Sequence, residues 1–224
     1  LITNPFSLMM GVFAIHTEVF MVRRLLQLYI GLVLYGVSTA LFVHANLGAD
    51  PWDVFHLGVA KQLNISFGTV IIATGAAVLL LWIPLRQMPG LGTISNVIVL
   101  GLAADATLAV LPPLESLPAR SLLLAGGVVM NAIATGMYIG AGFGPGPRDG
   151  LMTGLHARTG WSLRGIRTAI EVSVLLIGWL LGGKVGVGTV VYAFAIGPLI
   201  QLFLPWFRQP RAVSTAAKSR GLAS

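Results

Sequence analysis

Six apolar stretches of membrane-spanning length dominate this sequence. At about 18 to 21 residues, each is long enough for a helix rising ~1.5 Å per residue to cross a hydrocarbon core of roughly 30 Å. Only 9% of the 224 residues are charged, against about 25% in soluble domains. Lipid must therefore cover much of the surface, and the sequence predicts an all-α, polytopic membrane helix bundle. The stretches lie near residues 25–45, 66–85, 91–111, 121–141, 165–182 and 188–207.

Two shorter segments, 52–63 and 148–159, separate some of these spans. Each is compatible with a helix but too short to cross a bilayer. Interrupted backbone at membrane depth is tolerated only where protein or water satisfies its polar groups. We therefore expect two broken half-helices, which either re-enter the membrane or lie on its surface.

The first half of the membrane region recurs in the second half. Residues 25–111 align with 121–207 without a gap, and the informative identities are turn residues and an acid. These identities are Gly48/Gly144, Pro51/Pro147, Asp53/Asp149, Gly58/Gly154, Ser66/Ser162, Gly101/Gly197 and the Gly-x-Gly-Thr turns at 90–93 and 186–189. The sequence predicts a duplication, with repeat 1 at 23–112 and repeat 2 at 113–208.

The segments outside the repeats differ from them in composition. Residues 1–22 precede the first span and its two leading cations, so we expect an upstream extension or poorly ordered tail, with a short amphipathic helix as the alternative. Residues 209–224 are polar, basic and rich in small residues, which indicates a disordered cytoplasmic tail.

The distribution of cations predicts the orientation. The net charge of +7 would suggest nucleic acid in a soluble protein, but here the Lys and Arg residues lie mostly at the ends of apolar stretches, so we expect no nucleic-acid partner. With six spans and both termini in the cytoplasm, eleven cations lie inside and three outside, as the positive-inside rule requires.

Three spans per repeat make the repeats inverted, as in many secondary transporters. Four crossings per repeat would make them parallel, and would fit the charges less well.

Two Gly-x-x-Pro-x-Asp elements begin the short segments. One interpretation is local structure, because Pro favours the first helical position and an acid suits the first turn; Asp50 would then be the N-cap of the first element. The functional interpretation is that two half-helix N-termini point at a shared cavity. It makes Asp53 and Asp149 candidate site residues, supported by the backbone motif Gly48, Pro51, Gly144, Gly146 and Pro147.

Arg148 breaks the symmetry of these elements, because Trp52 holds its place in the first. A cation in the first turn opposes the helix dipole, so Arg148 needs a partner. We expect a pair with Asp53, Asp149 or Glu171, or an anionic ligand; the alternative is an interfacial Arg that reaches lipid phosphates.

Three other polar residues lie within predicted spans. Glu171 follows Arg167 by four residues, which favours an ion pair, although an ionisable residue in a span is otherwise a functional candidate. The same argument makes Asp105 a candidate. Asn131 is the third candidate, although it favours hydrogen bonds between helices. His56 and His156 lie in the short segments, where we expect interfacial side chains.

No recognisable catalytic or metal-binding pattern is present. There is no cysteine, and the four His residues are widely spaced. The Gly-x-Gly-Thr turns lack the preceding strand and the Lys of a phosphate-binding loop, so we interpret them as tight interhelical turns. We expect no metal, no cofactor and no enzymatic activity.

The segments 144–152 (GPGPRDGLM) and 50–56 (DPWDVFH) and the paired turns resemble the YczE/YyaS/YitT group of bacterial integral membrane proteins, and look most like its YczE-like branch. The resemblance covers roughly 23–207. It departs at Ala49-Asp50, where a Gly is common before the Pro. It implies a multi-pass protein of the bacterial inner membrane and supplies no substrate.

These patterns favour a small-solute secondary transporter or permease that binds an anionic or polar solute. The alternative is a non-transporting accessory or regulatory membrane protein, acting with a membrane partner or as a homo-oligomer. An enzyme acting on lipid-linked substrates has the least support.

Overall fold

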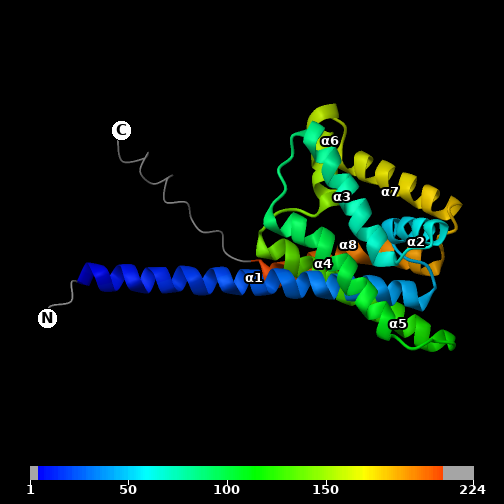
Figure 1. Cartoon of the computed structure of the whole chain (residues 1–224), viewed down its shortest axis with the longest axis horizontal. Helices are drawn as coiled ribbons and strands as arrows, with labels where there is room; N and C mark the ends of the chain where they lie inside the picture. The colour runs from blue at the N-terminus through cyan, green and yellow to red at the C-terminus, as the bar shows by residue number, and fades with distance from the viewer. Residues whose placement is uncertain (1–4, 209–224) are drawn as a thin grey trace.

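The computed structural model describes residues 5–208, with side chains from residue 18 onward, and this part of the chain forms eight helices and no strand (Figure 1). The helices are α1 (Pro5–Ala45), α2 (Pro51–Leu63), α3 (Phe67–Leu85), α4 (Leu91–Val110), α5 (Leu117–Ala141), α6 (Pro147–Thr159), α7 (Leu163–Leu180) and α8 (Val187–Phe207). Five of them, α1, α3, α4, α5 and α8, are long and apolar enough to cross a membrane. The prediction of an all-α membrane bundle is confirmed.

These five helices correspond to five of the six spans that the sequence predicts. The sixth expected span corresponds to α7, whose 18 residues include the charged side chains of Arg164, Arg167 and Glu171. With three charges in 18 residues, α7 is less apolar than the five long helices. The two short helices are present as expected, and α2 and α6 each have 13 residues.

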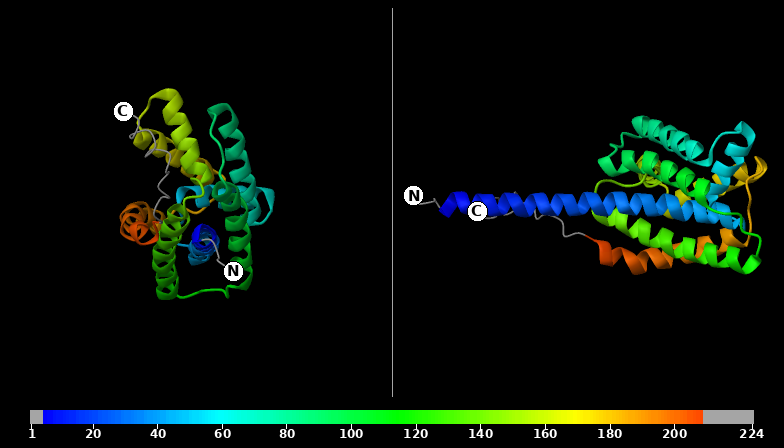
Figure 2. Two further views of the ribbon diagram at one scale, coloured as in Figure 1. Left: turned by 90° about the vertical axis from the view of Figure 1, so that its left-hand side faces the viewer. Right: turned by 60° about the horizontal axis from the view of Figure 1, so that its bottom comes forward.

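The N-terminal extension is not separate from the first span. Helix α1 runs without a break from Pro5 to Ala45, so the part of 1–22 that is described continues the span rather than forming a tail or a separate helix. This part of α1 projects beyond the rest of the bundle (Figure 2). The predicted tail, 209–224, lies outside the described residues.

Helix α1 lies antiparallel to α5, and two arginines hold the pair at its opposite ends. Arg24 Nε donates to Ala141 O at 2.9 Å, and Arg120 Nε donates to Ala45 O at 2.7 Å. Each guanidinium thus caps the C-terminus of the other helix, where carbonyls lack helical partners and the dipole favours a cation. Around this pair, α4 packs on α1, α8 on α5, α2 on α7, and α3 on both α4 and α6.

The Gly-x-Gly-Thr turns start α4 and α8, and each holds the loop that precedes one of the short helices. Gly92 N donates to Phe143 O at 2.9 Å, and Gly188 N donates to Leu47 O at 2.8 Å. Thr93 adds a hydrogen bond from Oγ1 to Pro145 O at 2.7 Å. The sequence predicts tight turns here, but not that they hold the loops before α6 and α2.

Gly48 shows why these loops need glycine. Its φ is +106°, and a Cβ there would lie 2.6 Å from Gly186 N. Both the left-handed backbone and the close approach exclude a larger residue. Gly144, with φ +121°, occupies the matching place before α6.

The start of α6 is fixed by a tryptophan from α3. Trp82 is 2% exposed and packs with Trp52, Val78 and Leu151, and its Nε1 donates to Pro147 O at 3.0 Å. These contacts place the first turn of α6, which carries Arg148 and Asp149, against α2 and α3.

Candidate functional site

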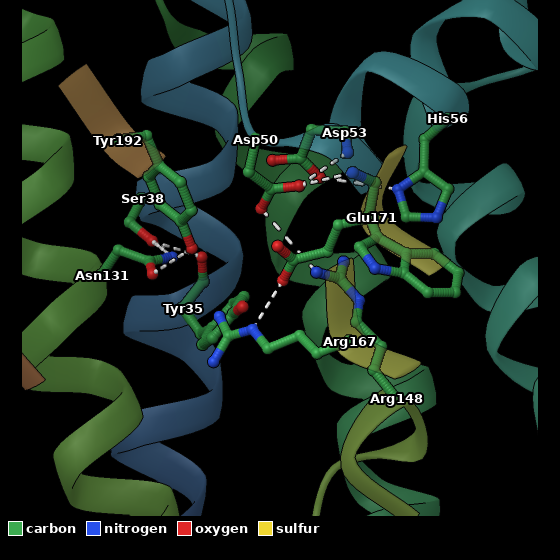
Figure 3. Close-up of polar contacts among 11 residues, drawn as sticks. Tyr35, Ser38, Asp50, Asp53, His56, Asn131, Arg148, Arg167, Glu171 and Tyr192 are labelled. Atoms are coloured by element: carbon green, nitrogen blue, oxygen red, sulfur yellow. Dashed lines mark hydrogen bonds and ion pairs between the residues drawn. The ribbon is translucent and has the colours of Figure 1, made fainter. Parts of the chain in front are cut away.

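A cavity of about 290 Å³ lies where the two short helices begin, and all eight helices or their leading loops line it. Its charged lining residues come from the start of α2, the start of α6 and α7 (Figure 3). They are Asp50, Arg148, Asp149, Arg167 and Glu171, together with His56 and the tyrosines Tyr35, Tyr138 and Tyr192.

Asp50 uses one carboxylate oxygen for structure and leaves the other free. It is the N-cap of α2, with Pro51 following in the first turn. Its Oδ1 accepts from Trp52 N at 2.8 Å and from Asp53 N at 2.9 Å, which satisfies two otherwise unpaired helix donors. Its buried Oδ2 has no hydrogen-bond partner and lies 3.8 Å from Arg148 Nη1.

Arg148 joins the starts of the two short helices. From the first turn of α6 its guanidinium lies over the ring of Trp52, 4.8 Å from the centroid, in cation–π geometry. Its side chain keeps 29% of its surface exposed. The sequence predicts a partner among Asp53, Asp149 and Glu171, whereas the ion pair found is with Asp50.

Asp53 and His56 lie behind this pair and are almost completely buried, 1% and 3% exposed. Asp53 Oδ1 lies 3.5 Å from His56 Nδ1, and neither Asp53 Oδ2 nor His56 Nδ1 has a hydrogen-bond partner. Burial, and then the Asp50 carboxylate, raise the pKa of Asp53 well above its usual range, while Arg148 acts in the opposite direction. The expectation that His56 is interfacial is wrong, because its ring packs among Trp52, Phe55 and Phe67.

Asp149 and Glu171 line the other side of the cavity. Tyr138 donates to Asp149 Oδ2 at 3.4 Å, and burial raises the pKa of the Asp149 carboxyl while Arg148 opposes that effect. Glu171 accepts from Arg167 Nε at 2.8 Å, in the expected i,i+4 pair. Because that pair is half exposed, the cavity reaches the surface along α7.

Asp105 and Asn131 do not line the cavity. Asp105, from α4, accepts from Gly68 N and Ser66 Oγ, both at 2.6 Å, and so caps the start of α3. Asn131 is fully buried in α5. It donates from Nδ2 to Ser38 Oγ at 2.9 Å and accepts from Tyr192 at 3.2 Å, linking α5 to α1 and α8 as the sequence predicts.

Sequence reasoning assigned Asp50 only to capping and did not select the three tyrosines. Tyr35, Tyr138 and Tyr192 lie within apolar helices, where a tyrosine is an ordinary packing residue. In the alignment of the two repeats, these tyrosines match Asn131, Phe42 and Asn96, respectively. Two of the three pairs thus combine a tyrosine with an asparagine, which is a partial signal for a polar site.

The polar groups that line the cavity could bind an anion. Across the described residues, no group of three His, Cys, Asp or Glu is placed to hold a metal ion. The Arg148 donors facing the cavity suit an anionic group, and the tyrosine hydroxyls and Asp149 supply further polar contacts.

Comparisons with known proteins agree with the resemblance drawn from the sequence. Residues 22–205 match a family described as a family of unknown function, DUF6198. An uncharacterized protein of Haemophilus influenzae is 39% identical over 177 residues, 79% of this chain and 81% of that protein. The uncharacterized membrane protein YczE of Bacillus subtilis is 30% identical over 179 residues, 79% and 83% of the two chains. The uncharacterized protein YyaS of the same organism is 23% identical over 180 residues, 79% and 90%. No solved structure matches.

Proposed function

This chain belongs to the family of unknown function DUF6198, and from that premise we propose that it is a small-solute secondary transporter or permease of the bacterial inner membrane rather than an enzyme. The observation that carries the proposal is the cavity of about 290 Å³ lined by Arg148 and by Asp50, whose buried Oδ2 has no hydrogen-bond partner. Such charges are costly away from water, and inside a membrane protein they mark solute or ion paths.

The transporter architecture would be two inverted repeats of four helices, α1–α4 and α5–α8. The bounds of the short helices support it, because Pro51–Leu63 and Pro147–Thr159 are separated by 96 residues at both ends. Reciprocal bonds support it too, because Arg24 binds Ala141 and Arg120 binds Ala45. The two arginines are 96 residues apart in the sequence, and so are the two alanines. In inverted-repeat transporters the solute binds between the repeats, where discontinuous helices begin, and the cavity lies at the corresponding place.

Arg148 would bind the solute. A guanidinium has five N–H donors in a planar fork that matches a carboxylate or phosphate, and the contact of Arg148 with Asp50, at 3.8 Å, is a loose ion pair. The cavity is close to the lower end of the usual range for ligand pockets, about 300–1,000 Å³. We therefore propose a small solute with one anionic group, held by Arg148 and lying against the tyrosines.

The orientation would place both termini in the cytoplasm, with α7 crossing as the sixth span beside the five long apolar helices. The excess of cations in the segments expected inside supports this orientation.

The test is a thermal-unfolding screen of purified protein in detergent against small carboxylates, phosphates, amino acids and nucleosides, followed by uptake into proteoliposomes. A solute bound only by the folded state at a hundred times its Kd stabilises the protein by about 2.7 kcal/mol. We expect a stabilising anion whose effect disappears in Arg148→Ala. It should persist in Arg164→Ala, which removes an exposed arginine from the start of α7.

Binding that is unchanged in Arg148→Ala would refute the assignment of the site. No binding and no uptake by a well-folded wild type would instead support the accessory-protein alternative. A stoichiometric membrane partner found on purification would then be the positive evidence for it.

A further inference from the structure

Two buried acids at the start of α2 face one arginine. Asp50 and Asp53 are 2% and 1% exposed, and each retains an Oδ2 without a hydrogen-bond partner. Among the residues whose side chains the structure describes, Arg148 makes an ion pair with Asp50 alone. If both acids were ionised, one negative charge would remain buried without a cation.

The groups around Asp53 do not supply that cation. Its own helix contributes His56, α1 contributes Tyr35, α8 contributes Tyr192, and α6 contributes Arg148. On α7, Arg167 is paired with Glu171. Burial and Arg148 both lower the pKa of His56, which keeps the ring neutral. An uncompensated buried carboxylate is costly, and two carboxylates sharing a site usually retain one proton.

We propose that Asp53 holds a proton while Asp50 pairs with Arg148. An anionic solute that draws Arg148 away from Asp50 brings a second proton onto the acid pair. The anion and the proton therefore bind together. This inference rests on the proposed function and deepens it by naming the proton as the coupled ion. The charges balance: the guanidinium moves from Asp50 to the solute anion, and a proton from water neutralises the Asp50 carboxylate. The net charge of the cavity is the same before and after.

The coupling can be measured without knowing the solute, because Arg148→Gln mimics the removal of the guanidinium from Asp50. Infrared spectra of protein labelled with carboxyl-¹³C aspartate distinguish protonated from ionised aspartates. At about pH 7 we expect wild type to contain a protonated aspartate that Asp53→Asn removes and Glu115→Gln, an exposed control, retains. We expect Arg148→Gln to contain a second protonated aspartate, absent from the double variant Asp50→Asn/Arg148→Gln.

The proposal is overturned if Asp53→Asn leaves the wild-type band unchanged, or if Arg148→Gln adds no second protonated aspartate. Size-exclusion profiles and unfolding temperatures establish that each variant is folded. Should Arg148→Gln fail to fold, Asp53→Asn against Glu115→Gln still decides whether Asp53 holds the proton. The infrared experiment uses no solute. Its result can therefore contradict the proton assignment while a solute is found to bind, or support it while no uptake is found. The two proposals can thus fail separately.

Discussion

Gly150 in α6 lies directly against the ring of Trp82, and we predict that Gly150→Ala is strongly destabilising for that reason. A Cβ at Gly150 would lie 2.0 Å from Cζ2 of Trp82 and 2.4 Å from Cη2. Ordinary carbon–carbon contact is about 3.5 Å, so ring and helix would have to separate by roughly 1.5 Å. The ring cannot move freely, because it is 2% exposed and its Nε1 is bonded to Pro147 O.

Overpacking a well-packed core costs about 1–3 kcal/mol, and we expect Gly150→Ala to reach the upper part of that range. The gain from Ala over Gly in a helix, about 1 kcal/mol, offsets only part of it. Gly126→Ala in α5 is the matched control, because a Cβ there meets no atom within 4 Å; we expect it to be neutral or slightly stabilising.

The assay is equilibrium unfolding in mixed micelles, with a double-mutant cycle between positions 82 and 150. Trp82→Ala alone removes a buried ring, but in that background Gly150→Ala meets no ring and should cost little. The two changes are therefore expected to couple by more than 1 kcal/mol. Additive effects, or a Gly150→Ala protein as stable as Gly126→Ala, would refute the packing argument.

Three further predictions concern polar contacts outside the cavity. Arg24→Gln and Arg120→Gln should each lower the free energy of unfolding by about 1–2 kcal/mol, because each frees a helix-terminal carbonyl; two clearly unequal effects in chemical unfolding would contradict the reciprocal geometry. Asp105→Ala should cost about 1–3 kcal/mol and increase amide exchange at Gly68, the donor that it leaves unpaired; unchanged exchange there would refute the capping role. Asn131→Ala should destabilise by about 1 kcal/mol and leave solute binding intact, since the side chain does not line the cavity; loss of binding in a folded variant would contradict that placement.

The helices were predictable because their signals are local. Apolar length identified the five long helices, and Pro51 and Pro147 identified the starts of the short ones. The sixth predicted span, at α7, is not confirmed, because three charges set this helix apart from the five long apolar ones. The sequence also separated residues 1–22 from the first span. Two adjacent cations before an apolar stretch resemble the start of a membrane span, although a helix can continue through them.

The partner of Arg148 was not predictable, for a reason that lies in Asp50. The sequence correctly predicted an N-cap, and that role accounted for the residue. A carboxylate has two oxygens, however, and only Oδ1 is used by the cap. Which residue lies beside Oδ2 depends on how α2 and α6 approach each other, and that approach is fixed by Trp82, Gly150 and the two turns rather than by local pattern.

The contacts between the turns and the loops before the short helices also constrain the order in which the protein is completed. Leu47 O accepts its hydrogen bond from Gly188 N, so this contact of the loop before α2 cannot form until the ribosome has made residue 188. The loop before α6, by contrast, finds Gly92 already synthesised. The loop before α2 therefore gains this contact only when α8, the last of the described helices, has begun, and α8 also completes the wall of the cavity.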